Sequence, residues 1–248
     1  MHVAPALLAA APGLALGSFL TVVAARLPAR RSLVRPGSTC SSCSSAIAWY
    51  DKVPLVSFAL LHGRCRRCHE RIPVRYPVIE GTTAALVSGS FLVYGATPTA
   101  ALAAVFCAVL VAVSVIDLEH RIIPNRIVLP AAVAVLAVRT ALDPSPEWAI
   151  AAVGAAGFFL AAVLVYPSGM GMGDVKLALL LGATLGRTVP IALMLGMISA
   201  LVPSLVLVAR HGSAARRMAL PFAPFLALGG LIALFVGERL LHVYLGTL

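Results

Sequence analysis

Two aspartates stand where long apolar segments meet charged residues, and they are the residues best placed to do chemistry. Asp117 ends a long apolar run. Asp174 follows the glycine-rich stretch Gly169-Met170-Gly171-Met172-Gly173 and precedes Lys176 by two residues. Ionisable residues within or at the ends of membrane segments are energetically costly and are usually functional. We therefore expect Asp117 and Asp174 to lie together as a catalytic pair.

Two neighbouring carboxylates can hydrolyse a peptide bond when one is ionised and the other is protonated. Their charges repel each other, so the pair holds one proton in common. The ionised acid takes a proton from water, and the protonated acid donates first to the scissile carbonyl group and later to the leaving amine. The sequence shows neither a serine nucleophile elbow nor a Cys–His pair near these acids. The pattern therefore favours an aspartic protease.

The glycines and the lysine beside Asp174 are candidate substrate-binding residues. Glycine allows positive φ and a close approach of another chain, so an extended substrate would fit against the backbone at Gly171 and Gly173. Lys176 would favour the charged form of Asp174, and a lysine that snorkels to the membrane interface is the alternative. Taken singly, Asp174 also suits a helix N-cap, and Asp117 suits a solvated interfacial acid.

Four cysteines form two C-x-x-C pairs with 21 residues between them: Cys40, Cys43, Cys65 and Cys68. This spacing is typical of a structural zinc site with four thiolate ligands. The surrounding loop, residues 27–76, is too small for a core of its own, so a bound metal would stabilise its fold. Disulfides or unligated thiols are the alternatives, and a reducing cytosol disfavours disulfides. Ser44 and His69 stand where a glycine often follows such pairs.

The amino-acid composition indicates which kind of secondary structure must position these residues. Of the 248 residues, 60% are hydrophobic and 11% are charged, with a mean hydropathy of +0.99. Soluble domains are about 45–50% apolar and about 25% charged. In lipid only helices or closed barrels satisfy their backbone, and strand-like alternation is absent here. We predict an all-α, polytopic membrane helix bundle with about eight transmembrane helices. Their expected ranges are 4–26, 77–96, 98–117, 127–142, 148–167, 176–187, 189–209 and 222–242. The sixth is short, and a buried or re-entrant helix is its alternative.

The distribution of Lys and Arg predicts the orientation, because basic residues concentrate in cytoplasmic segments. With the N-terminus outside, 16 of the 19 basic residues fall on the inner side. They lie in segments 26–76, 117–126, 168–176 and 210–221. This orientation places both aspartates at the cytoplasmic face. The net charge of +10 then indicates contact with an anionic inner leaflet rather than nucleic acid. Two Trp and five Tyr provide no basic–aromatic surface for stacking bases.

Further short motifs extend over most of the chain, and together they resemble one family. They are Gly17-Ser18-Phe19-Leu20, Arg26-Leu27-Pro28, Trp49-Tyr50-Asp51, Pro54, Ser57, Gly63-Arg64-Cys65, Ile72, Tyr76-Pro77, Glu80, Asp117 through Ile123-Pro124, Gly171 through Leu177, and Leu220 through Phe225. The ordered set resembles the type IV prepilin leader peptidases, the bifunctional prepilin peptidase/N-methyltransferases of bacterial membranes. Thr21 stands where this family usually has Asn, and Ala223 where it usually has Gly.

The resemblance implies a function in two steps. Asp117 and Asp174 would be the catalytic pair that removes a short basic leader from type IV prepilins and pseudopilins, after a glycine, at the cytoplasmic face of the inner membrane. The new N-terminal residue would then be methylated from S-adenosylmethionine, whose binding residues the sequence does not identify. Of the departures from the family pattern, Thr21 is the one that most directly concerns this methylation step. The implied domains are a first transmembrane helix (1–26), a four-cysteine loop associated with methyl transfer (27–76) and a transmembrane aspartyl peptidase domain (77–248).

Acidic residues near the same face are candidates for binding the basic leader. Asp51 and Glu80 match family positions, whereas Glu70 and Glu119 are equally explained as solvated surface acids. Three other functions are alternatives. A general G-x-G-D intramembrane protease without methyltransferase activity would use the same two acids, and a non-enzymatic membrane assembly protein would need neither. A proton relay or transporter would place acids at mid-bilayer or on both sides of it, and the predicted helix interiors contain almost none.

Overall fold

The computed structural model describes residues 2–35, 37–167, 170–212 and 220–246, and it confirms an all-helical chain. The described helices are α1 (Val3–Arg26), α2 (Val56–Leu60), α3 (Arg75–Tyr94), α4 (Pro98–His120), α5 (Asn125–Leu142), α6 (Glu147–Val165), α7 (Met172–Leu185), α8 (Val189–His211) and α9 (Ala223–Gly246). Two 3₁₀ turns, η1 (Trp49–Lys52) and η2 (Gly186–Thr188), complete the set. Within the described ranges, β pairing is limited to two isolated bridges in the cysteine loop.

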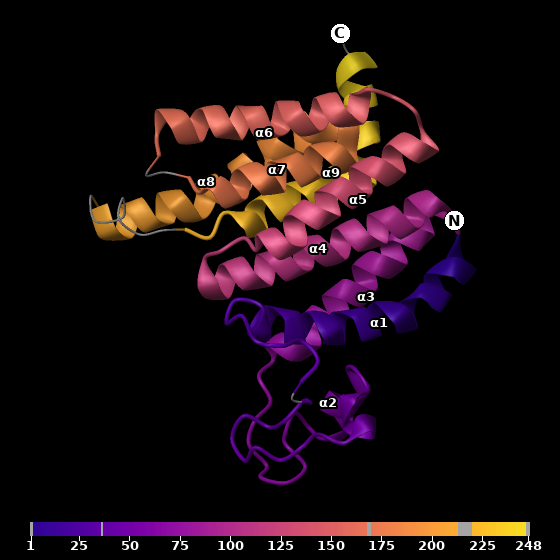
Figure 1. The fold of residues 1–248 in the computed structure, drawn as a ribbon, viewed down its shortest axis with the longest axis vertical. Helices are drawn as coiled ribbons and strands as arrows, with labels where there is room; N and C mark the ends of the chain where they lie inside the picture. Colours follow the sequence, from indigo (N-terminus) through magenta and orange to yellow (C-terminus); the bar gives the residue numbers. More distant parts are fainter. Residues whose placement is uncertain (1, 36, 168–169, 213–219, 247–248) are drawn as a thin grey trace. The chain divides into compact units, whose positions relative to one another are not determined.

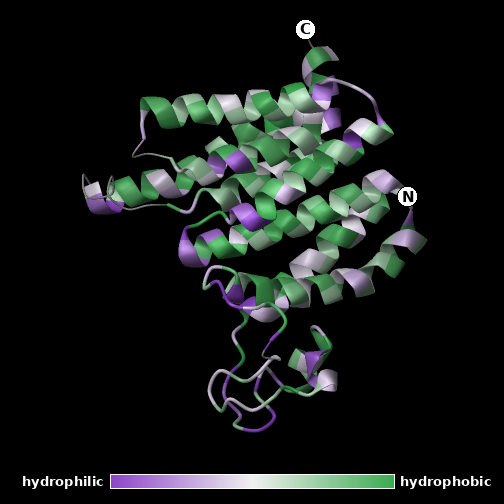
Figure 2. Cartoon of the chain, viewed as in Figure 1, coloured by the Kyte–Doolittle hydropathy of each residue, from purple (hydrophilic) through white to green (hydrophobic). Residues whose placement is uncertain are grey.

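Among the residues that the structure describes, six helical stretches are long and apolar enough to cross a membrane, which confirms the predicted membrane bundle. One of them, Met172–His211, comprises α7, η2 and α8 together. α3, which includes Glu80, is not among the six. Hydrophobic residues run along the long helices, and hydrophilic residues gather in the loop that precedes α3 (Figure 2). The eight long helices follow the predicted order, while the number of apolar spans is six.

The chain divides into two compact units, residues 1–112 and 113–248, and the division falls inside α4. In the first unit α1 and α3 lie side by side (Figure 1). Glycines allow this close approach: a Cβ at Gly13 would lie 2.9 Å from Ala84 Cα, and one at Gly17 would lie 2.7 Å from Glu80 Cα. Such small residues let helices pack closely in lipid. The predicted domain boundaries after residues 26 and 76 concern function and stay predictions.

In the second unit α7 is the central helix, packed against α5, α6, α8 and α9. From Asp174 to its end almost every α7 residue is buried. A Cβ at Gly182 would lie 2.6 Å from Ala152 Cα of α6, so these two helices also approach closely. The 14 residues of α7 extend about 21 Å, which is short of the ~30 Å hydrocarbon core. This agrees with the buried-helix alternative for the sixth predicted helix.

Candidate active site

Asp117 lies in the last turn of α4 and joins it to the start of α9. The residue is 6% exposed. Its Oδ2 accepts a hydrogen bond of 3.0 Å from the backbone N–H of Ala223, the first residue of α9. The first N–H groups of a helix have no partner within the helix, and that end carries partial positive charge. Asp117 is therefore held in place by a backbone donor that also favours a carboxylate.

Asp174 is the third residue of α7 and is 8% exposed. Its Oδ2 accepts a hydrogen bond of 3.3 Å from the N–H of Gly171, which is the N-cap residue. An acid at this position that bonds back to the N-cap N–H forms one half of a capping box. The simpler interpretation of Asp174 was a helix cap, and the structure shows such a contact at N3 rather than at the N-cap.

Both carboxylates belong to the second unit: Asp117 is in the last turn of α4, and Asp174 is in the first turn of α7. Each carboxylate uses Oδ2 for a backbone N–H. Among the described residues, neither Oδ1 accepts a hydrogen bond from a protein donor. In each aspartate, therefore, Oδ2 is held by a backbone N–H, and Oδ1 is left to interact with water or substrate.

The segment between α4 and α5 lies against the first turn of α7. A Cβ at Gly173 would lie 2.8 Å from Ile123 Cβ, whereas a Cβ at Gly171 would have no atom nearer than 3.8 Å. The Lys176 ammonium donates a hydrogen bond of 2.9 Å to Asn125 Oδ1. The bond found for Lys176 is therefore to Asn125, a residue that the sequence analysis missed, and not to Asp174. Gly169, the first glycine of the motif, lies outside the described residues.

The four predicted metal ligands form one cluster in the first unit. The sulfur atoms of Cys40, Cys43, Cys65 and Cys68 lie within 4.8 Å of one another, and Cys40 Sγ is 3.8 Å from Cys68 Sγ. Zn–S bonds of about 2.3 Å in a tetrahedron place sulfurs about 3.8 Å apart. None of these thiols is joined in a disulfide. The donor set and its spacing therefore fit a zinc ion.

Each cysteine pair is folded into the same tight turn. The Ser44 N–H donates to the Cys40 carbonyl group and the His69 N–H to the Cys65 carbonyl group, both at 3.0 Å. Ser44 and His69 have φ of 54° and 55°, a region that favours glycine. The turns therefore form at the usual glycine positions without glycine. Hydrogen bonding by the Ser45 side chain lowers the pKa of Cys43 to about 6, whereas burial and the neighbouring thiols raise the pKa of Cys68 to about 12.

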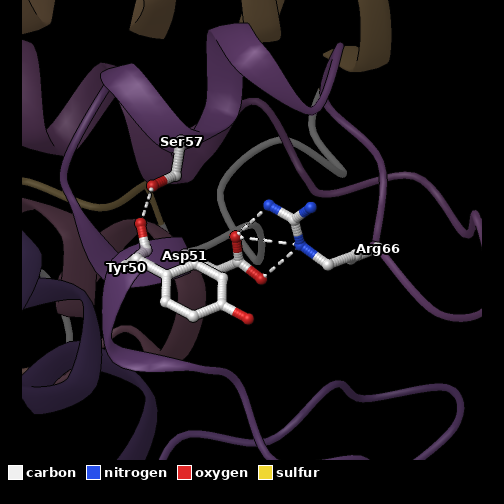
Figure 3. Close-up of polar contacts among 4 residues, drawn as sticks. All are labelled: Tyr50, Asp51, Ser57 and Arg66. Atoms are coloured by element: carbon white, nitrogen blue, oxygen red, sulfur yellow. Dashed lines mark hydrogen bonds and ion pairs between the residues drawn. The ribbon is translucent and has the colours of Figure 1, made fainter.

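The two candidate leader-binding acids both have partners inside the first unit. Asp51, whose side chain is 11% exposed, accepts three charged hydrogen bonds from Arg66, at 2.7 Å from Nη2 and at 2.9 and 3.2 Å from Nε (Figure 3). These bonds hold the pKa of Asp51 below its ordinary value. Glu80 is 8% exposed, and its Oε2 accepts a 2.9 Å hydrogen bond from the Leu55 N–H. These contacts favour structural roles, and leader binding by the two acids stays a prediction.

Comparison with known proteins covers nearly the whole chain. A profile of the bacterial peptidase A24 N-terminal domain matches residues 12–94, and one of the type IV leader peptidase family matches residues 104–205. No solved structure matches.

Several relatives carry the name prepilin leader peptidase/N-methyltransferase. The one from Bacillus subtilis is 33% identical over 94% of this chain and 95% of its own length. Those from Burkholderia pseudomallei (strain 1026b) and Pseudomonas putida are each 34% identical. They align with 91% and 94% of this chain, and with 83% and 91% of their own lengths. Identity at this level over almost the full length shows common ancestry, and the chain therefore belongs to the type IV leader peptidase family.

Proposed function

We propose that this protein is a prepilin leader peptidase that cleaves the leader with Asp117 and Asp174 and then N-methylates the new N-terminus. The names of its relatives support both activities. The observation that carries the peptidase assignment is the pair of buried carboxylates, each oriented by one backbone N–H.

The cleavage step uses the two carboxylates in different protonation states. The ionised acid removes a proton from a water molecule, which attacks the scissile carbonyl carbon. The protonated acid donates its proton to the carbonyl oxygen, and a proton later passes to the leaving amine as the C–N bond breaks. The bonds from Gly171 and Ala223 fix one oxygen of each acid, so the free oxygens keep a constant orientation during these transfers. Such preorganisation is a main source of rate enhancement.

The proposed setting is the bacterial inner membrane, with the N-terminus outside and the carboxylates at the cytoplasmic face. The distribution of basic residues supports this orientation. It would bring the aspartates to the side on which a basic prepilin leader is retained.

The second activity is proposed for the N-terminal part of the chain. Its support is the profile match over residues 12–94, which include the cysteine cluster. A zinc ion held by the four thiolates would stabilise the loop fold, and S-adenosylmethionine, when bound, would supply the methyl group. Thr21, at the position where Asn is usual, is 8% exposed, and its hydroxyl donates to the Ser18 carbonyl group at 2.7 Å. The hydroxyl of Thr21 is therefore bonded within its own helix.

The test is cleavage and methylation of a synthetic prepilin by the purified full-length protein. Leader loss and methyl gain are read separately by mass spectrometry, with and without S-adenosylmethionine. Asp117→Asn and Asp174→Asn should each reduce cleavage by at least about 100-fold. Methylation of a prepilin already lacking its leader should persist in both variants. Full cleavage by either variant would reject the catalytic pair.

The same assay separates the alternatives. A general G-x-G-D protease would cleave unrelated membrane peptides equally well and would transfer no methyl group. A non-enzymatic assembly protein would do neither, and both aspartate substitutions would then have no effect.

A further inference from the structure

We infer that the η1–α2 segment binds the bilayer surface by inserting a set of exposed apolar side chains among the lipid headgroups. This set, called here the η1–α2 surface, comprises Trp49, Val53, Val56 and Leu60. These residues are 80%, 42%, 51% and 73% exposed. An apolar patch exposed next to membrane helices is a candidate for lipid contact.

The segment is attached to the side of α3, well inside that helix. The Leu55 N–H donates to Glu80 Oε2 at 2.9 Å, and a Cβ at Gly81 would lie 4.0 Å from Leu55 Cδ1. Glu80 is five residues beyond the start of α3, which is about 8 Å along the helix. The interfacial layer on each side of a bilayer is about 5–8 Å deep. The η1–α2 segment is therefore fixed beside the body of α3 and not beyond its end.

The packing of α3 on α1 supports this position. The Cα of Glu80 faces Gly17, which lies in the interior of the 24-residue candidate span Val3–Arg26. Nine residues separate Gly17 from the end of that span, or about 13 Å. A segment fixed at the level of Glu80 therefore lies beside a membrane-crossing helix, where lipid is the surrounding medium.

Two polar side chains of the segment, Ser57 and Asp51, have partners within the protein, as an environment poor in water favours. The Ser57 hydroxyl donates to the Tyr50 carbonyl group at 2.9 Å, and Asp51 forms its bidentate ion pair with Arg66 (Figure 3). Arg66 lies between Cys65 and Cys68, so the ion pair also fixes the segment to the cysteine cluster. Apart from Lys52, the exposed side chains of the segment are mainly apolar.

The charge of the surrounding chain identifies the lipid as anionic. Residues 26–76 contain ten Lys and Arg and only two acids, and one of these acids, Asp51, is paired with Arg66. Basic residues beside a membrane attract anionic headgroups, and Trp is enriched at the membrane–water interface. A basic segment with an exposed tryptophan and three aliphatic side chains fits this partner.

The test uses Trp49 as its own probe. The chain has two tryptophans, so Trp148→Phe leaves Trp49 alone. The full-length variant is reconstituted into vesicles of phosphatidylcholine and phosphatidylglycerol, with and without phosphatidylcholine brominated near the headgroup. We expect brominated lipid to reduce Trp49 emission at least about two-fold and aqueous acrylamide to quench it weakly. Strong acrylamide quenching without lipid quenching would overturn the inference, and so would protection from both quenchers, which would indicate a protein cover. No prepilin is present, so the result is independent of the proposed function.

A pair of variants tests the apolar contacts directly. Val56→Asp with Leu60→Asp, made in the Trp148→Phe protein, should lower the quenching by brominated lipid at least two-fold. Val34→Asp is the matched control, because Val34 is 81% exposed in the same loop and outside the η1–α2 surface. Bound zinc, measured in parallel, reports whether the loop remains folded. Unchanged lipid quenching in a zinc-containing double variant would overturn the inference.

Discussion

Lys176 on α7 donates a 2.9 Å hydrogen bond to the side-chain oxygen of Asn125, the first residue of α5. Ile123, two residues before Asn125, lies against Gly173 of α7. These contacts hold the connection between α4 and α5 on the first turn of α7. Asp117 lies in the last turn of α4 and Asp174 in the first turn of α7, so these contacts link the two segments that carry the carboxylates.

Replacing Asn125 with Ala should therefore slow cleavage without unfolding the protein. A hydrogen bond to a charged group contributes about 1.5–3 kcal/mol, and less when exposed. We expect kcat to fall about 3- to 10-fold with little change in KM, because the reacting groups and not the substrate are displaced. Arg126→Ala, at the next exposed position, is the control and should retain activity. An Asn125→Ala enzyme with the kcat of the unmodified protein would show that the contact does not position the pair.

The two glycines of the site should differ sharply in their tolerance of a methyl group. Gly173→Ala would force its Cβ to within 2.8 Å of Ile123 Cβ, so the loop or the helix must shift. We expect at least about a 10-fold loss of cleavage, because a small displacement of reacting groups is costly. Gly171→Ala has space, with its nearest neighbours at 3.8 Å, and φ at Gly171 is −88°. A large loss in Gly171→Ala would instead indicate that substrate lies against that residue.

The donor to Asp117 can be removed by changing Ala223 to Pro. Proline has no N–H and is tolerated at the first position of a helix, which is the place of Ala223 in α9. We expect cleavage to fall about 10-fold or more, since an unpaired buried carboxylate oxygen loses its orientation. Ala223→Gly keeps the N–H and should remain active. Thermal unfolding of both variants distinguishes a loss of overall stability from a specific loss of activity. Equal cleavage rates in the two variants would show that the hydrogen bond from Ala223 to Asp117 has no catalytic role.

The helices of this protein were readily predicted because long apolar runs have few alternatives in lipid. The glycine-rich stretch was harder. A glycine indicates either unusual φ or close packing, and the pattern does not say which. At Gly171 the backbone is ordinary, while at Gly173 the requirement is the approach of Ile123. α7 also begins four residues before the predicted start at residue 176, because Met172 and Gly173 belong to its first turn.

Pairings between residues distant in sequence explain the rest of what was missed. Nothing beside Asn125 distinguishes it from an ordinary residue after a proline, and its partner lies 51 residues away. Asp51 and Glu80 were conspicuous as acids near a basic loop. Their partners, Arg66 and the Leu55 N–H, became evident only from the fold.

Removing metal from the cysteine cluster should affect the two activities unequally. Chelation, or Cys65→Ser, should release the zinc and make the loop at residues 27–76 sensitive to protease, because so small a segment lacks a core. The cluster lies in the first unit and the two aspartates in the second. We therefore expect methylation to fall at least about 10-fold while most cleavage persists. Metal content is measured by mass spectrometry, and Cys107→Ala, a buried cysteine outside the cluster, is the control. Equal loss of both activities would contradict this separation.

Glu80 distinguishes a structural contact from recognition of the basic leader. Its Oε2 accepts the N–H of Leu55, whose φ of 59° is unusual for a non-glycine residue. Gln offers a similar acceptor without charge, so Glu80→Gln should retain both the loop structure and the KM for prepilin. Glu80→Lys removes the acceptor and should increase the proteolysis of residues 53–60. If the negative charge instead binds the leader, Glu80→Gln will raise KM several-fold, and its protease resistance will remain that of the unmodified protein. Steady-state kinetics on a prepilin peptide, run beside limited proteolysis of the same samples, separates the two roles.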